Sequence, residues 1–152
     1  MIWTACFWPL VIKIMTSLLD KINKLGLKMT DQRRTIVKVL AESNDHPDVE
    51  LVYQRVAKID KKIGIATVYR TIKLFEENNI IEKHDFKKDG RFRYEQVPDE
   101  HHDHLIDVKN DKVIEFQNDD IEKLQKKVAE ELGYKLVDHR LELYAVPIER
   151  KK

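Results

Sequence analysis

The sequence has very little cysteine: Cys6 is the only one among 152 residues. A single thiol cannot form an intrachain disulfide, and it cannot supply the clustered thiolates of a cysteine-rich zinc site. This composition is typical of a reducing compartment, so we expect a cytoplasmic protein. Any metal that the chain binds should therefore be held by nitrogen and oxygen ligands.

The sequence also lacks an apolar run long enough to span a membrane. The most apolar stretch, residues 1–15, carries one charge, Lys13, but is shorter than the roughly 20 residues that a spanning helix needs. It has no positive region typical of a secretory signal. We expect residues 1–16 to be an apolar extension outside the domain, either an upstream start before a natural one at Met15 or a packing arm. No membrane partner is expected.

Neither sign of charge dominates, since the formal net charge is +1. The charges are nevertheless unevenly distributed. Residues 17–96 contain 17 Lys and Arg against 13 Asp and Glu, whereas residues 97–152 contain 10 against 14. The basic half suits a polyanionic partner and the acidic half suits cations, which supports two domains with different roles.

Residues 17–96 are predicted to form a winged helix-turn-helix domain. Thr30 and Asp48 are expected to cap two helices with apolar faces, and a third helix is expected over residues 66–78. Two strands, residues 80–86 and 91–95, flank an Asp-Gly step that is typical of a hairpin. In this architecture the third helix enters the major groove of DNA. Its exposed strip of Tyr69, Arg70 and Lys73 is therefore predicted to face a double-stranded operator.

Residues 97–152 are predicted to form a small α/β domain, which makes the whole chain α+β. Short strands are expected at residues 105–108 and 113–116, followed by a helix to about residue 132 that Asp119 or Asp120 caps. A last strand is expected over residues 134–145. A sheet of three strands leaves an open face or edge, so we expect a homodimerisation domain.

The run His101-His102-Asp103-His104 holds half of the six histidines. Side chains alternate between the faces of an extended segment, so His101 and Asp103 should point one way and His102 and His104 the other. Three histidines and one aspartate in four positions suit neither a solvated turn nor an apolar core. We therefore predict two metal half-sites, one on each face.

Other candidate ligands can be grouped with each face. Glu122 and His139 could join His101 and Asp103 inside the carboxyl-terminal domain, although His139 alone would suit a hydrogen-bonded core histidine. The other face could recruit His46, Glu95 and Glu115 into a site that joins the two domains. His84 is expected at the surface. Mixed nitrogen and oxygen ligands suit Fe²⁺, Mn²⁺ or Zn²⁺.

Four segments together resemble the ferric uptake regulator family: residues 26–30 with Arg33, residues 65–71, residues 101–106 and residues 113–116. The resemblance implies a dimeric, metal-dependent transcriptional repressor that binds palindromic operators when it is loaded with Fe²⁺ or Mn²⁺. It assigns a hinge regulatory site to His46, Glu95, His102, His104 and Glu115. It assigns a second site, in the dimerisation domain, to His101, Asp103, Glu122 and His139.

The sequence departs from the family where many members have a Cys-x-x-Cys motif for structural zinc. Asp107 and Asn110 occupy those positions, so no thiolate zinc site is expected. The chain resembles a cysteine-poor branch that includes manganese-responsive regulators, which leaves iron or manganese open as the regulatory metal and Zn²⁺ possible at either site. Peroxide sensors of the family carry aspartates in place of Glu95 and Glu115, which disfavours that role.

The predicted DNA contacts divide by chemistry. Tyr69 and Arg70 should meet base edges, whereas Lys28, Arg33 and Lys73 should meet phosphates or the minor groove. We expect no enzyme and no small-molecule substrate. A metallohydrolase with a His/Asp zinc site is an alternative, but the chain lacks the glycine-rich loops and further ligand segments of such folds. A metal buffer without DNA binding is a second alternative, which the basic strip argues against.

Overall fold

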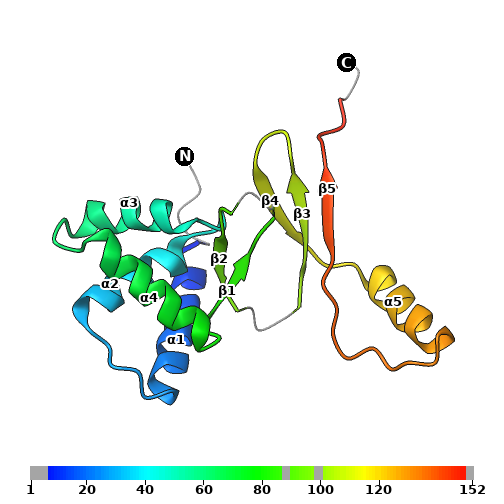
Figure 1. Cartoon of the computed structure of the whole chain (residues 1–152), viewed down its shortest axis with the longest axis horizontal. Coiled ribbons are helices and arrows are strands. Elements are labelled where there is room, and N and C mark those ends of the chain that lie inside the picture. Colours follow the sequence, from blue (N-terminus) through cyan, green and yellow to red (C-terminus); the bar gives the residue numbers. More distant parts are fainter. Residues whose placement is uncertain (1–6, 87–89, 98–100, 150–152) are drawn as a thin grey trace. The chain divides into compact units, whose positions relative to one another are not determined.

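The protein is described here by a computed structural model that covers residues 7–86, 90–97 and 101–149 (Figure 1). The chain divides into two compact units, Met1–Val97 and Pro98–Lys152, close to the boundary expected between residues 96 and 97. None of the helices in the described ranges combines the length and the apolar character that a membrane span requires.

The described part of the amino-terminal unit contains the helices α1 (Phe7–Lys24), α2 (Asp31–Glu42), α3 (Val49–Ile59) and α4 (Ile65–Glu77). The two predicted caps are confirmed. The Thr30 side chain accepts a hydrogen bond from the backbone N–H of Arg33, and Asp48 accepts one from Leu51 at 2.8 Å. Each cap satisfies a helix N–H group that has no partner within the helix, which fixes where α2 and α3 begin.

The helices share one apolar core, because their buried side chains recur at three- and four-residue spacing. Val52 and Val56 in α3 are fully buried, and Phe75 in α4 is 1% exposed. Burial of each large side chain contributes roughly 1.5–3 kcal/mol, so this core is the main source of stability in the unit. Its other members include Leu18, Ile22, Ile36, Val37, Ile63, Val68, Ile72, Ile80 and Ile81.

Helix α1 includes residues 7–16 of the stretch for which an extension or a packing arm was predicted. It runs without interruption from Phe7 to Lys24, so it crosses the expected boundary. Val11 is buried, and Met15 packs against the core that contains Leu18 and Ile22. These four positions follow a four, three, four spacing, so the apolar face of one helix continues through residue 16. Residues 1–6 lie outside the described range.

A hairpin completes the amino-terminal unit. Strands β1 (Ile81–His84) and β2 (Arg93–Gln96) pair antiparallel, with Glu82 opposite Glu95. The predicted turn includes Asp89, which lies outside the described residues, while Gly90 has a φ of 78°, which favours glycine. The series of helices followed by a hairpin confirms the predicted winged helix-turn-helix fold.

The carboxyl-terminal unit contains a mixed sheet and one helix. Strand β3 (Asp103–Asp107) lies between β4 (Lys112–Phe116), which is antiparallel to it, and β5 (Glu142–Ala145), which is parallel. Helix α5 (Asp119–Glu131) connects β4 to β5. This arrangement confirms the α+β class. The helix cap is Asn118 rather than Asp119 or Asp120, because its side chain accepts hydrogen bonds from the backbone N–H groups of Asp120 and Ile121.

The last strand is much shorter than the predicted range of residues 134–145. Only Glu142–Ala145 is a strand, and Val137 is 93% exposed. The pairing with β3 begins at His104 opposite Glu142 and ends at Asp107 opposite Ala145. Before Glu142, the carbonyl of Leu141 still accepts a hydrogen bond from the backbone N–H of His104 at 3.2 Å, but residues 134–141 form no strand, and His139 lies in an irregular segment.

The turn between β3 and β4 is closed by Asp107 and Asn110. Asp107 Oδ1 accepts hydrogen bonds from the backbone N–H groups of Lys109 and Asn110 at 3.0 and 3.1 Å, and Oδ2 accepts one from the Asn110 amide at 2.8 Å. The Asn110 side chain is the main reason that the pKa of Asp107 lies below 3.8. Hydrogen bonds close the turn where the resemblance would place thiolates.

Candidate metal centres and nucleic-acid interface

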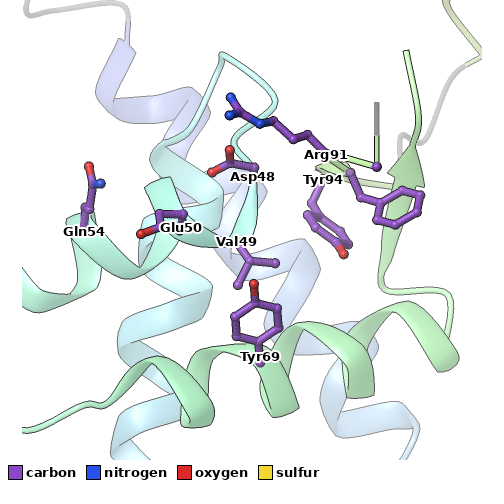
Figure 2. A pocket seen from close by; sticks show the side chains of 9 residues that line it. Asp48, Val49, Glu50, Gln54, Tyr69, Arg91 and Tyr94 are labelled. Atoms are coloured by element: carbon purple, nitrogen blue, oxygen red, sulfur yellow. The ribbon is translucent and has the colours of Figure 1, made fainter. Parts of the chain in front are cut away.

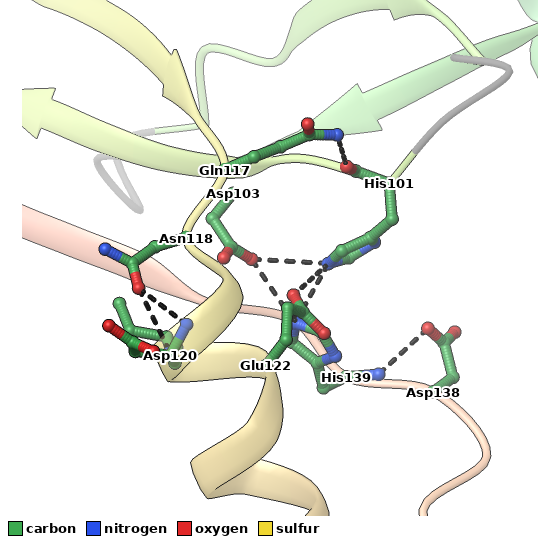
Figure 3. Close-up of polar contacts among 9 residues, drawn as sticks. His101, Asp103, Gln117, Asn118, Asp120, Glu122, Asp138 and His139 are labelled. Atoms are coloured by element: carbon green, nitrogen blue, oxygen red, sulfur yellow. Dashed lines mark hydrogen bonds and ion pairs between the residues drawn. The ribbon is translucent and has the colours of Figure 1, made fainter.

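The carboxyl-terminal unit brings together four side chains that can ligate a metal: His101, Asp103, Glu122 and His139 (Figure 3). The Nε2 atoms of His101 and His139 are 2.9 Å apart. Asp103 Oδ1 lies 3.3 Å from His101 Nε2 and 3.4 Å from His139 Nε2. Glu122 Oε1 is 3.2 Å from His139 Nε2 and 3.9 Å from His101 Nε2. The predicted group thus converges on one point.

Different elements bring these side chains together. Asp103 is the first residue of β3, His101 comes two residues before it, and Glu122 lies in the first turn of α5. The Asn118 cap fixes the start of that helix, and the side chain of Gln117 donates a hydrogen bond to the carbonyl of His101 (Figure 3). The helix cap thus positions Glu122, the Gln117 hydrogen bond positions His101, and the pairing of β3 with β4 positions Asp103.

The geometry of this cluster fits a divalent ion. Ligands at 2.0–2.2 Å from a tetrahedral ion stand roughly 3.3–3.6 Å apart, and neighbouring ligands of an octahedral shell stand roughly 3 Å apart. The five measured separations, from 2.9 to 3.9 Å, span both values. Asp103 is 1% exposed, so a cation would compensate a carboxylate that is removed from water.

The same unit holds a second, smaller group on the other side of the histidine run. The rings of His102 and His104 lie 4.9 Å apart, edge to face. His104 in β3 pairs with Glu115 in β4, whose Oε1 atom is 3.9 Å from His102 Nε2. This grouping follows the alternation predicted from the sequence. It supplies two imidazoles and one carboxylate.

The amino-terminal unit holds a third group around Glu95. Oε2 of Glu95 lies 2.8 Å from Nε2 of His46, and Oε1 lies 2.6 Å from Nε2 of His84. His46 occupies a left-handed backbone conformation with a φ of 49° just before Pro47. Two of the predicted ligands, His46 and Glu95, are therefore already in contact within one unit.

The prediction that His84 lies at the surface is wrong, because its side chain is only 3% exposed. Its ring stacks on Phe86 with centroids 4.9 Å apart and an interplanar angle of 2°. The alternation of an extended segment could have indicated this burial, because residues two apart share a face and His84 therefore lies on the same face as the apolar Phe86.

The predicted DNA-binding side chains lie on α4 and around the start of α2. Tyr69 is 54% exposed, Arg70 is exposed, and Lys73 forms a surface ion pair with Glu77 at 3.9 Å. Such a pair contributes little, so Lys73 can exchange it for a phosphate. Arg33, in the first turn of α2, donates a hydrogen bond to the carbonyl of Lys28.

A groove of about 410 Å³ lies beside Tyr69, between the start of α3 and the hairpin (Figure 2). Val49, Tyr94 and Phe92 contribute apolar surface to it, while its polar lining includes both Arg91 and carboxylates. Burial is the largest cause that raises the pKa of Tyr94 to about 12, so this phenol stays neutral. The carboxylates, Asp48 and Glu50, disfavour a phosphate inside the groove.

Comparisons with known proteins agree with the resemblance. A sequence model of the ferric uptake regulator family matches residues 24–144. The ferric uptake regulation protein of Rhizobium leguminosarum bv. viciae is 55% identical over 126 residues, which cover 83% of this chain and 88% of that protein. Two solved structures are also similar. A zinc-bound manganese uptake regulator shares 58% identity with a TM-score of 0.75, covering 86% of this chain and 98% of its own. The Helicobacter pylori ferric uptake regulator, described as revealing three functional metal binding sites, shares 33% identity with a TM-score of 0.77, covering 91% and 92%.

Proposed function

Because this chain belongs to the ferric uptake regulator family, we propose that it is a metal-dependent, DNA-binding transcriptional repressor of iron or manganese homeostasis. It acts in the cytoplasm on an operator and has no small-molecule substrate. Its regulatory metal is Fe²⁺ or Mn²⁺, and Zn²⁺ can occupy either site. Similar proteins named for ferric uptake and for manganese uptake, one of them zinc-bound, support this range of metals.

The observation that carries the proposal is that each unit holds an incomplete set of ligands. The amino-terminal unit offers His46 and Glu95, and the carboxyl-terminal unit offers His102, His104 and Glu115. Zinc takes four ligands and manganese commonly six, so neither set alone fills a coordination shell. In our proposal one ion takes ligands from both sets and thereby selects one arrangement of the two units.

Metal binding controls DNA affinity only if the ion binds one arrangement more tightly than the others. An ion that needs ligands from both units meets that condition, because any arrangement that separates the sets leaves the shell incomplete. The four-residue cluster of His101, Asp103, Glu122 and His139 lies within one unit. We assign it a supporting role in stabilising that unit.

The DNA contacts follow from the winged helix. Tyr69 and Arg70 would meet base edges in the major groove, and Lys28, Arg33 and Lys73 would meet phosphates or the minor groove. Because Arg33, in the first turn of α2, donates to the carbonyl of Lys28, the loop that carries Lys28 would be held against the helix that carries Arg33. Affinity should fall as salt rises, since each phosphate contact releases counterions.

A homodimer would give the repressor two DNA-binding units for a palindrome. Support comes from the apolar side chains of α5, none of which is buried in the chain described here. Leu124 is 60% exposed and Val128 45%. Strand β5 adds Leu143 and Tyr144, which are 39% and 51% exposed. Surfaces of this kind mark sites where another protein packs.

The test is an anaerobic DNA-binding titration with Fe²⁺, Mn²⁺ and Zn²⁺ on the wild type and on the His102→Ala/His104→Ala variant. We expect the wild type to bind its operator only with metal and the variant to lose that dependence. A variant that binds with unchanged metal dependence would refute the hinge site. A wild type that binds metal but no DNA with any ion would instead favour a metal buffer, and turnover of a hydrolysable ester would favour a metallohydrolase.

A further inference from the structure

His84 and Glu95 form a contact that the proposed ligand sets do not use. His84 Nε2 lies 2.6 Å from Oε1 of Glu95, while His46 Nε2 lies 2.8 Å from Oε2 of the same carboxylate. An ionised carboxylate only accepts hydrogen bonds, so each imidazole donates through Nε2. Glu95 is therefore held from both sides, by one predicted ligand and by one histidine outside the predicted sets.

An aromatic side chain fixes the orientation of both imidazoles. Phe86 is 2% exposed and stacks on the His84 ring. It also meets the His46 ring edge to face, with centroids 6.1 Å apart and an interplanar angle of 78°. A stacked ring in a packed interior cannot turn without displacing its neighbours. The donor atom of His84 is thus aimed at Glu95 before any ion arrives.

We infer that His84 is a positioning residue, which holds Oε1 of Glu95 so that Oε2 alone faces the regulatory metal. The inference rests on the proposed role of Glu95 as a ligand. An ion that enters between His46 and Glu95 replaces their hydrogen bond and leaves the His84 contact intact. Hydrogen bonds to a metal-bound carboxylate fix its direction, and their loss typically weakens metal binding about 10- to 100-fold.

The contacts favour positioning over ligation by His84. Its Nε2 atom and that of His46 meet different oxygens of Glu95, and the two ring centroids are 6.5 Å apart. One ion could take both imidazoles only if at least one of them left Glu95. Glu82 could offer a further carboxylate beside His84, but it is exposed, and its contribution can be tested separately.

The test compares Mn²⁺ binding by calorimetric titration of the full chain carrying His84→Ala, His84→Gln or Glu82→Gln. Among the Mn²⁺-binding steps in the titration, the one assigned to the regulatory site is the step that Glu95→Gln abolishes. We expect His84→Ala to weaken it about 10- to 100-fold. The glutamine amide can donate from nearly the position of Nε2, so His84→Gln should restore most of the affinity, and Glu82→Gln should change nothing. If His84→Ala does not fold, His84→Asn, whose amide is too short, takes its place.

A second measurement uses the metal-free protein. The ¹⁵N signal of His46 Nε2 should shift in His84→Ala, because Glu95 is released on one side, and should return in His84→Gln. Unchanged Mn²⁺ affinity in His84→Ala would overturn the inference, and so would a loss that His84→Gln does not restore. If Glu95→Gln binds Mn²⁺ like the wild type, that result refutes the proposed role of Glu95 as a ligand, on which the inference about His84 rests.

Discussion

Asp103→Asn is the sharpest perturbation of the four-residue cluster, because it keeps the shape of the side chain and removes its charge. Asp103 is 1% exposed and lies 3.3 and 3.4 Å from the two imidazoles of the cluster. A neutral amide is a much weaker ligand for a hard divalent ion than a carboxylate. We expect the variant to fold and to lose most of its stabilisation by metal.

The expected magnitude follows from linkage between binding and folding. A ligand present at 100 times its Kd stabilises the native state by about 2.7 kcal/mol. For a domain as small as the carboxyl-terminal unit, Pro98–Lys152, this raises the Tm by roughly 10–20 °C. If the variant binds about 100-fold more weakly, the same metal concentration only equals its Kd. The stabilisation then falls to about 0.4 kcal/mol, or roughly 2–3 °C.

Scanning calorimetry with and without Zn²⁺ or Mn²⁺ measures these shifts. Asp138→Asn is the matched control, since Asp138 is exposed and accepts only from the backbone N–H of its neighbour His139 among the contacts in Figure 3. Both variants keep the ligands of the proposed hinge site, so its contribution cancels between them. Equal metal-induced shifts in Asp103→Asn and Asp138→Asn would refute the assignment of the cluster as a metal site.

Three further predictions concern the core, the β3–β4 turn and the DNA interface. Phe75→Ala should destabilise the amino-terminal unit by about 3–5 kcal/mol in urea unfolding, because Phe75 is 1% exposed in the core; a loss below about 1 kcal/mol would contradict that packing. Asp107→Ala should lower stability at neutral pH. The folded pKa of Asp107 is lowered, so its contribution to the free energy of unfolding is fully present above the unfolded pKa of about 3.9 and is lost as pH falls through the folded pKa. The stabilities of variant and wild type should therefore converge in acid titrations as the pH falls below about 4. Arg70→Ala should cost about 1–3 kcal/mol of operator affinity and relax specificity at one base pair, whereas Lys73→Ala should weaken all sequences alike and reduce the salt slope by about one; identical effects of the two changes in salt-dependent binding assays would refute the division of roles.

Features encoded by neighbouring residues could be predicted from the sequence. The caps at Thr30 and Asp48 depend on one side chain and an N–H group three residues away. The separation of His101 and Asp103 from His102 and His104 follows from the alternation of an extended chain. These patterns predicted the winged helix and the two faces of the histidine run without knowledge of the sheet.

Features that depend on distant partners were missed. The length of β5 is limited by where β3 offers partners, so the composition of residues 134–141 could not reveal that they form no strand. His139 still reaches the cluster, but from an irregular segment. Glu95, across the hairpin, supplies the hydrogen-bond partner of the buried His84, and α1 crosses residue 16 because a core formed by other helices receives its apolar face.

In the proposed mechanism, metal binding and DNA binding are coupled through ligands from both units. Thermodynamic linkage requires the coupling to be reciprocal. The most direct test is therefore to measure the Kd of the regulatory site for Mn²⁺ with and without saturating operator DNA, under anaerobic conditions. We expect DNA to tighten Mn²⁺ binding by the same factor by which Mn²⁺ tightens DNA binding, and His46→Ala to remove both effects. A Mn²⁺ affinity that operator DNA leaves unchanged would contradict it.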